Sequence, residues 1–160
     1  MTIDTSKLKS LYINGKKVAS LSLNGKKLKL SGGESSPYLT ITALEAPCNV
    51  IWLRTGSPTA SIDYSIDGST WTSYEYNTHI TLTTVGQSVM FRATTANSTF
   101  SSDDSNYYTL HADSGIQASG DIMSLLGAEL TVATVPNRCF RGLFRDCTRL
   151  SSIDGLKLGA

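Results

Sequence analysis

The sequence predicts a mainly β protein built from three parts. Two Asn-Gly turns in the first 30 residues predict hairpins, and residues 38–110 alternate between apolar and polar positions with turn residues at intervals of about eight to twelve. Apolar residues at helical spacing near position 140, followed by regularly placed leucines, predict a short α/β segment at the C-terminal end. The 160 residues, 40% of them hydrophobic, suffice for one ordinary domain, or for a small module with part of a second.

The N-terminal part, 1–30, contains a sequence duplication. The stretch LYINGKKVA is followed ten residues later by the similar LSLNGKKLK. Asn14-Gly15 and Asn24-Gly25 each favour a two-residue hairpin, because the type I′ turn needs positive φ at both central positions. A three-stranded meander over residues 7–30 is therefore expected, with Ile13 opposite Lys16 and Leu21 opposite Leu28.

Alternation along these strands places apolar side chains on both faces of the small sheet. Three strands of this length are marginally stable alone. Neighbouring copies of the module, a docking partner or the following domain could cover the two faces. We expect an attachment and oligomerisation surface of seven residues, three on one face and four on the other: Leu11, Ile13 and Val18, and then Leu21, Leu23, Leu28 and Leu30.

A linker, 31–37, rich in Gly and Ser, precedes a predicted β-sandwich over residues 38–112. Seven short strands separated by turns such as Asp67-Gly68 are typical of the immunoglobulin or fibronectin type of sandwich. The predicted strands are 38–44, 50–53, 61–66, 70–74, 79–83, 88–92 and 107–110.

Alternation within these strands predicts which side chains face the core. Trp52 and Trp71 are expected to pack in the core or at its rim. Five residues are expected to point inward: Ile62, Tyr64, Ile66, Val89 and Phe91. Ser61, Asp63 and Ser65 are expected to point outward.

The C-terminal part, 113–160, has a different pattern. Residues 121–126 resemble a helical turn, and residues 136–150 predict a short helix with one apolar stripe. That stripe contains Cys139, Phe140, Leu143, Phe144 and Cys147. The aliphatic residues that follow, from Leu150 to Leu158, indicate the start of a leucine-rich-repeat solenoid.

Charge is unevenly distributed, with seven lysines and one aspartate in residues 1–30 and a net charge of +1 overall. A basic segment is compatible with nucleic-acid binding. Four of the lysines directly follow the hairpin turns, however, where lysine commonly prevents unwanted edge pairing. We therefore expect partners other than nucleic acid.

Cys48, Cys139 and Cys147 are an odd number of cysteines without a CxxC spacing, which favours buried free thiols over a disulfide framework or a zinc site. The sequence shows neither a signal peptide nor an apolar run of membrane-spanning length. An ordinary export signal and membrane insertion are accordingly not expected.

Catalytic motifs are not found in the sequence. His79 and His111 are expected at strand surfaces or strand ends. The loop around Asp103-Asp104 is rich in oxygen atoms, and a solvated turn is favoured over a calcium site because the spaced ligand pattern is missing. The expected protein is a non-enzyme without cofactor or metal.

Several stretches, in order, resemble the Bacteroidetes and phage proteins that place an Ig-like domain before BspA-like leucine-rich repeats: YSIDGSTWTSY, ITLTTVGQSVMFRATTANSTFSS, SGDIMSLL and CFRGLFRDCTRLSSIDGLKL. The duplicated opening is similar to the N-terminal segment of structural proteins from phages that infect gut Bacteroidetes. A solenoid buries its core by stacking several units, so a single unit before Ala160 is expected to belong to a longer array.

This resemblance implies a phage virion structural protein, either a head or tail fibre or a capsid decoration subunit. Such a protein would attach through its N-terminus as a homo-oligomer, for example a trimer, and contact other virion proteins and a host-surface glycan or protein. Extracellular-type modules without an export signal fit a location in the virion. The alternative is a bacterial cell-surface leucine-rich-repeat adhesin whose signal peptide is missing from this sequence, and a nucleic-acid binder is a third option.

Overall fold

The computed structural model describes residues 36–97, 99–127, 135 and 137–158, together with the backbone of four short strands nearer the N-terminus. The chain divides into two compact units, residues 1–35 and residues 36–160. In the first unit, β1 (Tyr12–Ile13) pairs with β2 (Lys16–Lys17), and β3 (Leu21–Leu23) pairs with β4 (Lys26–Leu28). Both pairs are antiparallel, and each forms a two-stranded sheet.

The predicted hairpin register is confirmed at both turns. Ile13 lies opposite Lys16, and Leu21 lies opposite Leu28. The predicted three-stranded meander is wrong, because β2 and β3 belong to different sheets. The middle strand of the prediction is thus two strands, and the residues between them lie outside the described part of the chain.

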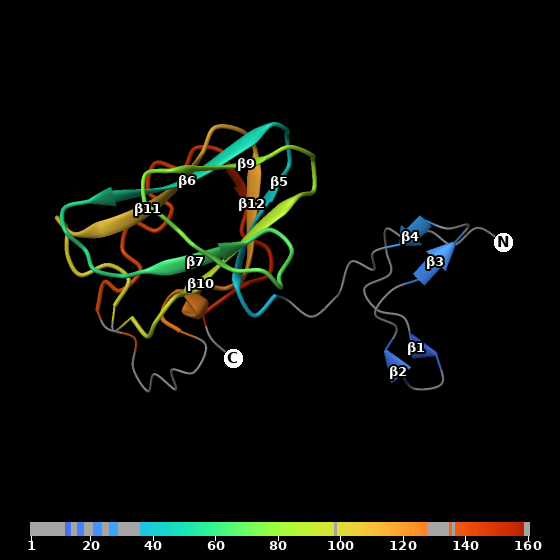
Figure 1. Ribbon diagram of the computed structural model, residues 1–160, viewed down its shortest axis with the longest axis horizontal. Coiled ribbons are helices and arrows are strands. Elements are labelled where there is room, and N and C mark those ends of the chain that lie inside the picture. The colour runs from blue at the N-terminus through green and yellow to red at the C-terminus, as the bar shows by residue number, and fades with distance from the viewer. Residues whose placement is uncertain are drawn as a thin grey trace. The chain divides into compact units, whose positions relative to one another are not determined.

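In its described residues, the second unit contains ten strands, distributed over two sheets, and one short 3₁₀ helix. The larger sheet has the order β13-β12-β5-β10-β7-β8, with β14 also paired to β12, and the smaller has the order β11-β6-β9 (Figure 1). The elements are β5 (Leu39–Ala43), β6 (Cys48–Thr55), β7 (Ile62–Ser65), β8 (Thr72–Ser73), β9 (His79–Leu82), β10 (Ser88–Ala93), β11 (Tyr107–Ala112), β12 (Ile116–Asp121), the 3₁₀ helix η2 (Ile122–Leu125), β13 (Leu150–Ser152) and β14 (Leu156–Lys157).

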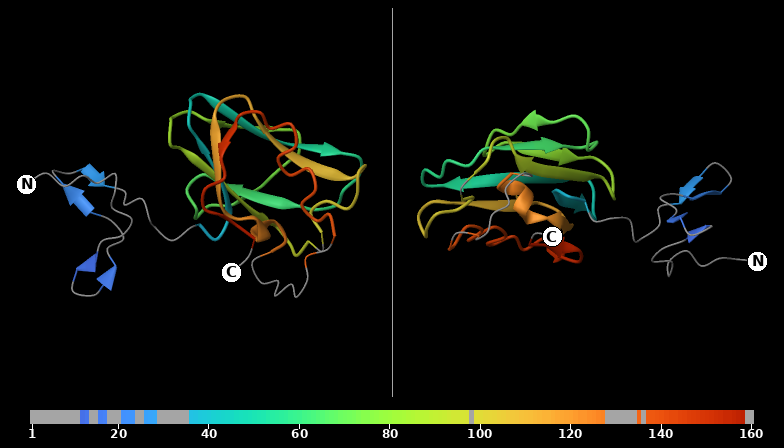
Figure 2. Two further views of the ribbon diagram at one scale, coloured as in Figure 1. Left: turned by 180° about the vertical axis from the view of Figure 1, so that it is seen from behind. Right: turned by 90° about the horizontal axis from the view of Figure 1, so that it is seen from below.

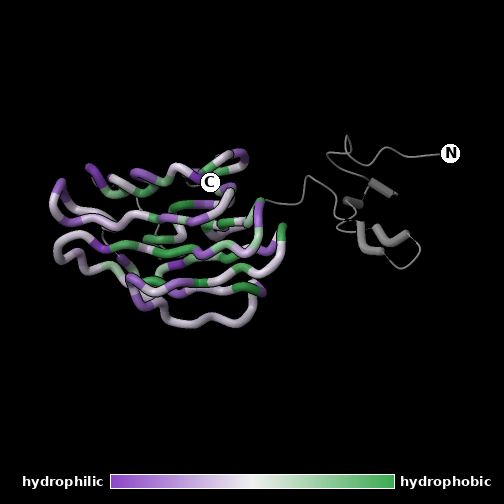
Figure 3. Tube along the Cα trace, turned by 90° about the horizontal axis from the view of Figure 1, so that it is seen from above, coloured by the Kyte–Doolittle hydropathy of each residue, from purple (hydrophilic) through white to green (hydrophobic). Residues whose placement is uncertain are grey.

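Side chains from both sheets form one apolar core. Trp52 of β6 is fully buried, and its ring meets Phe91 of β10 edge-on with the centroids 5.5 Å apart. Phe100 lies on another side of the same indole, at 5.3 Å. The apolar stretches in Figure 3 run along the strands, and the most hydrophilic stretches lie in loops. Because aromatic side chains bury large areas, this cluster stabilises the second unit.

The seven predicted strands are confirmed as β5 to β11, and the mainly β class is confirmed with them. Trp52, Ile62, Val89 and Phe91 are buried as expected, while Trp71 and Tyr64 are half-buried.

The inward position predicted for Ile66 is wrong, since 56% of this residue is exposed. Alternation stops at Ser65, whose hydroxyl oxygen accepts hydrogen bonds from the N–H groups of Asp67 and Gly68 and so begins a turn. The turn also explains why Ser65 is buried, although its register partner Met90 places it on the outer side of the sheet.

The C-terminal segment continues the larger sheet. β12 pairs antiparallel with β5, and β13 and β14 both pair parallel with β12. Figure 2 shows this segment, in red, running along the orange β12 strand. The expected division near residue 112 falls between β11 and β12 along the chain. β12 pairs directly with β5 in the larger sheet.

The predicted helix over residues 136–150 is wrong. The described residues 137–149 form a series of tight turns, which we call the turn ribbon, with N–H groups bonded to carbonyl groups three residues earlier. The φ angles are +65° at Arg138, +73° at Gly142 and +57° at Asp146, and a positive φ every four residues is incompatible with an α-helix. The predicted helical turn at 121–126 is realised as the 3₁₀ helix η2.

The turn ribbon buries one residue in four. Cys139 and Leu143 are buried and Cys147 is half-buried, whereas Arg138, Arg141, Arg145 and Arg149 are exposed. A stripe at this spacing also fits a helix, which is why the sequence pattern was misleading here. Within the part of the chain that the structure describes, no helix has the length and apolar character needed to cross a membrane.

Candidate functional site

A polar hollow of about 420 Å³ lies where the turn ribbon meets the smaller sheet. It is lined by Tyr107, Arg141, Gly142 and Arg145. Tyr107 is the first residue of β11, and the other three belong to the ribbon. The hollow therefore joins two segments that are more than 30 residues apart in the chain, in a region rich in hydrogen-bond donors.

Gly142 allows the ribbon to approach Tyr107 closely. Its φ is +73°, and a Cβ atom built on it would lie 3.0 Å from Cδ2 of the Tyr107 ring. The N–H of Leu110 also donates to the carbonyl oxygen of Leu143 at 2.9 Å, which attaches the ribbon along the outer edge of β11. Positive φ and limited space both favour glycine at position 142.

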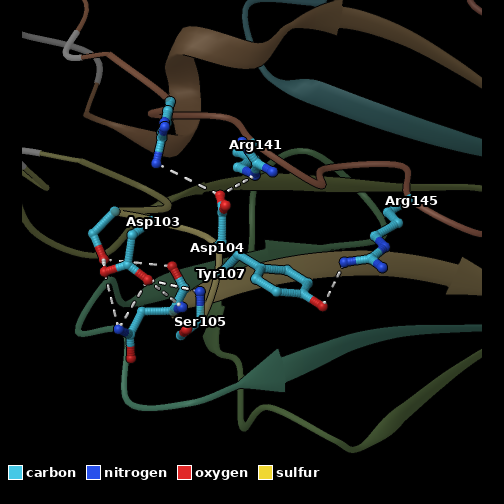
Figure 4. Close-up of polar contacts among 9 residues, drawn as sticks. Asp103, Asp104, Ser105, Tyr107, Arg141 and Arg145 are labelled. Carbon is cyan, nitrogen blue, oxygen red and sulfur yellow. Dashed lines mark hydrogen bonds and ion pairs between the residues drawn. The ribbon is translucent and has the colours of Figure 1, made fainter.

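The arginines of the hollow are held by specific partners (Figure 4). Nη1 of Arg145 donates to the hydroxyl oxygen of Tyr107 at 3.1 Å, and the guanidinium carbon lies 5.6 Å from the ring centroid. Nε of Arg141 is 2.8 Å from Oδ1 of Asp104, and Nη1 of Arg138 is 3.6 Å from the same oxygen. A single carboxylate thus contacts two guanidinium groups.

The neighbouring Asp103 stabilises the loop that carries Asp104. Its carboxylate accepts hydrogen bonds from the side-chain amide of Asn106 and from the N–H groups of Ser105 and Asn106. These bonds, that from the Asn106 side chain first, lower the pKa of Asp103 because they favour the charged form. The loop is a network of internal hydrogen bonds, and among the described residues no group of three or more His, Cys, Asp or Glu side chains could hold a metal ion.

An apolar hollow of about 510 Å³ lies beside the polar one, and the two share Gly142 and Arg145. Ile153 and Leu158 are its most exposed members, at 56% and 74%. The other apolar residues of its lining are Ile122, Phe140, Leu143, Phe144 and Leu156. Arg145 therefore lines both the polar hollow and the open apolar surface.

Comparison with known proteins gives no relative. No family model, curated protein or solved structure matches this chain. The side chains of the site itself offer hydrogen-bond donors, an aromatic hydroxyl and apolar surface.

The predicted attachment surface lies only in part within the described residues. Ile13 lies in β1, Leu21 and Leu23 lie in β3, and Leu28 lies in β4, where the structure describes the backbone. Leu11, Val18 and Leu30 lie outside the described part. The register brings Leu21 and Leu28 opposite each other, and the attachment role of all seven residues stays a prediction.

The histidines and cysteines noted in the sequence lie in different parts of the second unit. His79 is an exposed first residue of β9, and His111 is half-buried in β11. The three cysteines are free, and burial raises the pKa of the thiols of Cys48 and Cys147.

The sequence patterns did not identify three residues of the site: Tyr107, Arg141 and Arg145. The available signal was the recurrence of arginine at positions 138, 141, 145 and 149 between apolar residues. On a helix, arginines at these positions would indicate only a solvent-exposed face. Tyr107 had no signal of its own, because the contact with it depends on the turn ribbon.

Proposed function

We propose that this protein is a phage virion structural protein, a head or tail fibre or a capsid decoration subunit. Its N-terminal hairpins attach it and make it oligomeric, and its Ig-like and leucine-rich parts display a surface for adhesion to a host glycan or protein. Its action is non-catalytic binding, in which several weak contacts per particle add up through avidity.

The observation that carries this proposal is the parallel pairing of β12 with β13 and β14. The segment that carries Leu150 and Leu156 pairs with a strand of the larger sheet, which supports the proposed leucine-rich part. The N–H of Gly120 donates to the carbonyl oxygen of Gly155 at 3.2 Å, and both glycines have a φ of +81°. Successive parallel strands with equivalent turns are typical of a solenoid, and an Ig-like sandwich followed by such a coil is the module order of the resemblance noted above.

The attachment role is supported by the N-terminal unit. Residues 1–35 form a compact unit distinct from residues 36–160. Their two hairpins have the register that the duplicated Asn-Gly turns favour. Short two-stranded sheets gain stability when they are covered, and copies of the same module would supply that cover in an oligomer.

Light scattering on the full chain tests this proposal. The wild type should have the mass of an oligomer, and the double variant Leu21→Glu, Leu23→Glu should have the mass of one chain, because charges cannot be buried in an apolar interface. Ser22→Glu on the same strand is the matched control and should remain oligomeric. A wild type that is monomeric at all concentrations would contradict the attachment role.

The cell-surface adhesin is the second candidate, favoured by the same Ig-like and leucine-rich order. A gold-labelled antibody against the chain separates the two, since a virion protein is labelled on purified particles and an adhesin on bacterial cells. Nucleic-acid binding by the basic segment would instead appear as an affinity that falls steeply with salt concentration.

A further inference from the structure

We propose that the polar hollow of Tyr107, Arg141 and Arg145 binds the carboxylate of an acidic saccharide. This inference rests on the proposed adhesive function and names the ligand class for it. The site is the hollow of about 420 Å³ between β11 and the turn ribbon.

The lining of this hollow presents donors in excess of acceptors. Neither aspartate nor glutamate lines it. Arg141 uses Nε toward Asp104, and Arg145 uses Nη1 toward Tyr107 and Nε toward Asp146, while a guanidinium group has five N–H donors. The hydroxyl of Tyr107 accepts from Arg145, so its own proton is available for donation. Several donors that converge on one space select a negatively charged acceptor, and a carboxylate matches the planar guanidinium groups.

The two arginines are held in place before any ligand arrives. Arg141 is fixed by its 2.8 Å contact with Asp104, whose loop is in turn stabilised by Asp103. Arg145 donates through Nη1 to the hydroxyl of Tyr107, and its Nε lies 3.5 Å from Oδ2 of Asp146. The two side chains remain 47% and 60% exposed, so a ligand can reach them from solvent. Because long side chains that are already ordered lose less entropy on binding, the arrangement favours recognition.

The adjoining apolar hollow indicates what else the ligand carries. It shares Gly142 and Arg145 with the polar hollow and is lined mainly by Phe and aliphatic side chains. A small apolar substituent close to the carboxylate, such as the methyl group of an N-acetylated sugar acid, would fit there. Ligand sites of this kind combine apolar surface with a few polar groups that fix orientation.

A saccharide is favoured over a peptide because the strand edge beside the hollow, that of β11, is partly covered by the described turn ribbon. Extended peptides commonly bind by adding a strand to an open sheet edge. On the outer edge of β11, the N–H of Leu110 already donates to the carbonyl oxygen of Leu143 in the turn ribbon. Recognition here depends on side-chain donors, which suits the scattered oxygen atoms of a sugar acid.

Calorimetric titration of the full chain with 3′-sialyllactose, and with lactose as the uncharged partner, tests the proposal. The sialylated sugar should bind with a Kd on the order of 0.1–1 mM and lactose at least roughly 10-fold more weakly. Arg141→Gln and Arg145→Gln should each lose roughly 10-fold in affinity, and Tyr107→Phe less. Higher salt should weaken binding, since the charges are exposed.

Arg149→Gln is the matched control, because Arg149 is an exposed arginine of the same ribbon that does not line the hollow. It should bind like the wild type. Near-ultraviolet circular dichroism verifies that each variant is folded. Equal binding of lactose, unchanged affinity in both arginine variants, or tighter binding of a short acidic peptide would each overturn the proposal.

The saccharide titration and the light-scattering test can succeed or fail independently of each other. An oligomer that ignores acidic sugars leaves the virion role intact and refutes the saccharide site. A monomer that binds 3′-sialyllactose through Arg141 and Arg145 supports the site and removes the attachment role.

Discussion

The sheets around Trp52 and the turn ribbon at 137–149 are stabilised in different ways. In the sheets, apolar side chains on alternate positions meet across one core, and Trp52 packs against Phe91 and Phe100. In the ribbon, backbone conformation comes first, with positive φ at every fourth residue and hydrogen bonds that span three residues. Side-chain volume is therefore critical in the sheets, whereas a few backbone angles are critical in the ribbon.

Removing Trp52 should have the largest effect in the molecule. Trp52→Ala leaves a cavity between the two sheets and should lower the free energy of unfolding by about 3–5 kcal/mol. Urea denaturation followed by circular dichroism measures this loss. Trp71→Ala is the control, because Trp71 is half-buried beneath Arg92 at the surface and its loss should be about 1 kcal/mol. Equal losses would show that the core does not depend on Trp52.

A methyl group at Gly142 should have an intermediate effect, located in the ribbon. Gly142→Ala meets both an unfavourable φ and the Tyr107 ring at 3.0 Å, so a loss of about 1–3 kcal/mol is expected. Gly86→Ala has a similar φ of +83° with open space around its Cβ, and should lose about 1 kcal/mol.

Spectroscopy can locate the damage caused by Gly142→Ala. Amide hydrogen exchange should accelerate at Leu143 and Arg145 while the β6 and β10 amides stay protected. Protection lost equally in the sheets would break the distinction between the two regions.

Acid should destabilise the loops that contain Asp67 and Asp113 more than the sheets around Trp52 or the turn ribbon. Hydrogen bonds from Thr70, Ser69 and Ser65 lower the pKa of Asp67, and bonds from Asn49 lower that of Asp113. A carboxylate whose pKa is lower in the folded state contributes stability above its unfolded value, and loses it as pH falls through the folded value. Tm should therefore fall between about pH 5 and about pH 2.

Asp67→Asn keeps a side-chain oxygen that can accept the hydrogen bonds of this loop, but it removes one titrating group. It should therefore reduce the fall in Tm. Asp154→Asn, an exposed aspartate near β14, is the control and should leave the slope unchanged. A slope that Asp67→Asn does not alter would assign the acid sensitivity elsewhere.

The sequence was sufficient for β5 to β11 because period-two alternation is imposed by the strand itself. It failed at Ile66, where the hydroxyl of Ser65 starts a turn that alternation does not encode. It failed at the ribbon because Cys139, Leu143 and Cys147 recur every four residues, a spacing shared by helices and by consecutive turns. The polar hollow could not be predicted for the same reason, because Tyr107 contacts Arg145 only once the ribbon is folded.

The placement of β5 between β10 and β12 has a consequence for biosynthesis. The hydrogen bond from Leu39 to Ser124 spans 85 residues, and β5 gains its second neighbour only when β12 has been made. Until then one edge of β5 is open, and an open edge next to apolar residues such as Ile41 invites pairing between nascent chains. Long-range strand pairing of this kind also slows folding. A chain ended after β11 should therefore aggregate, so the segment after residue 112 is needed to complete the first strand of the body.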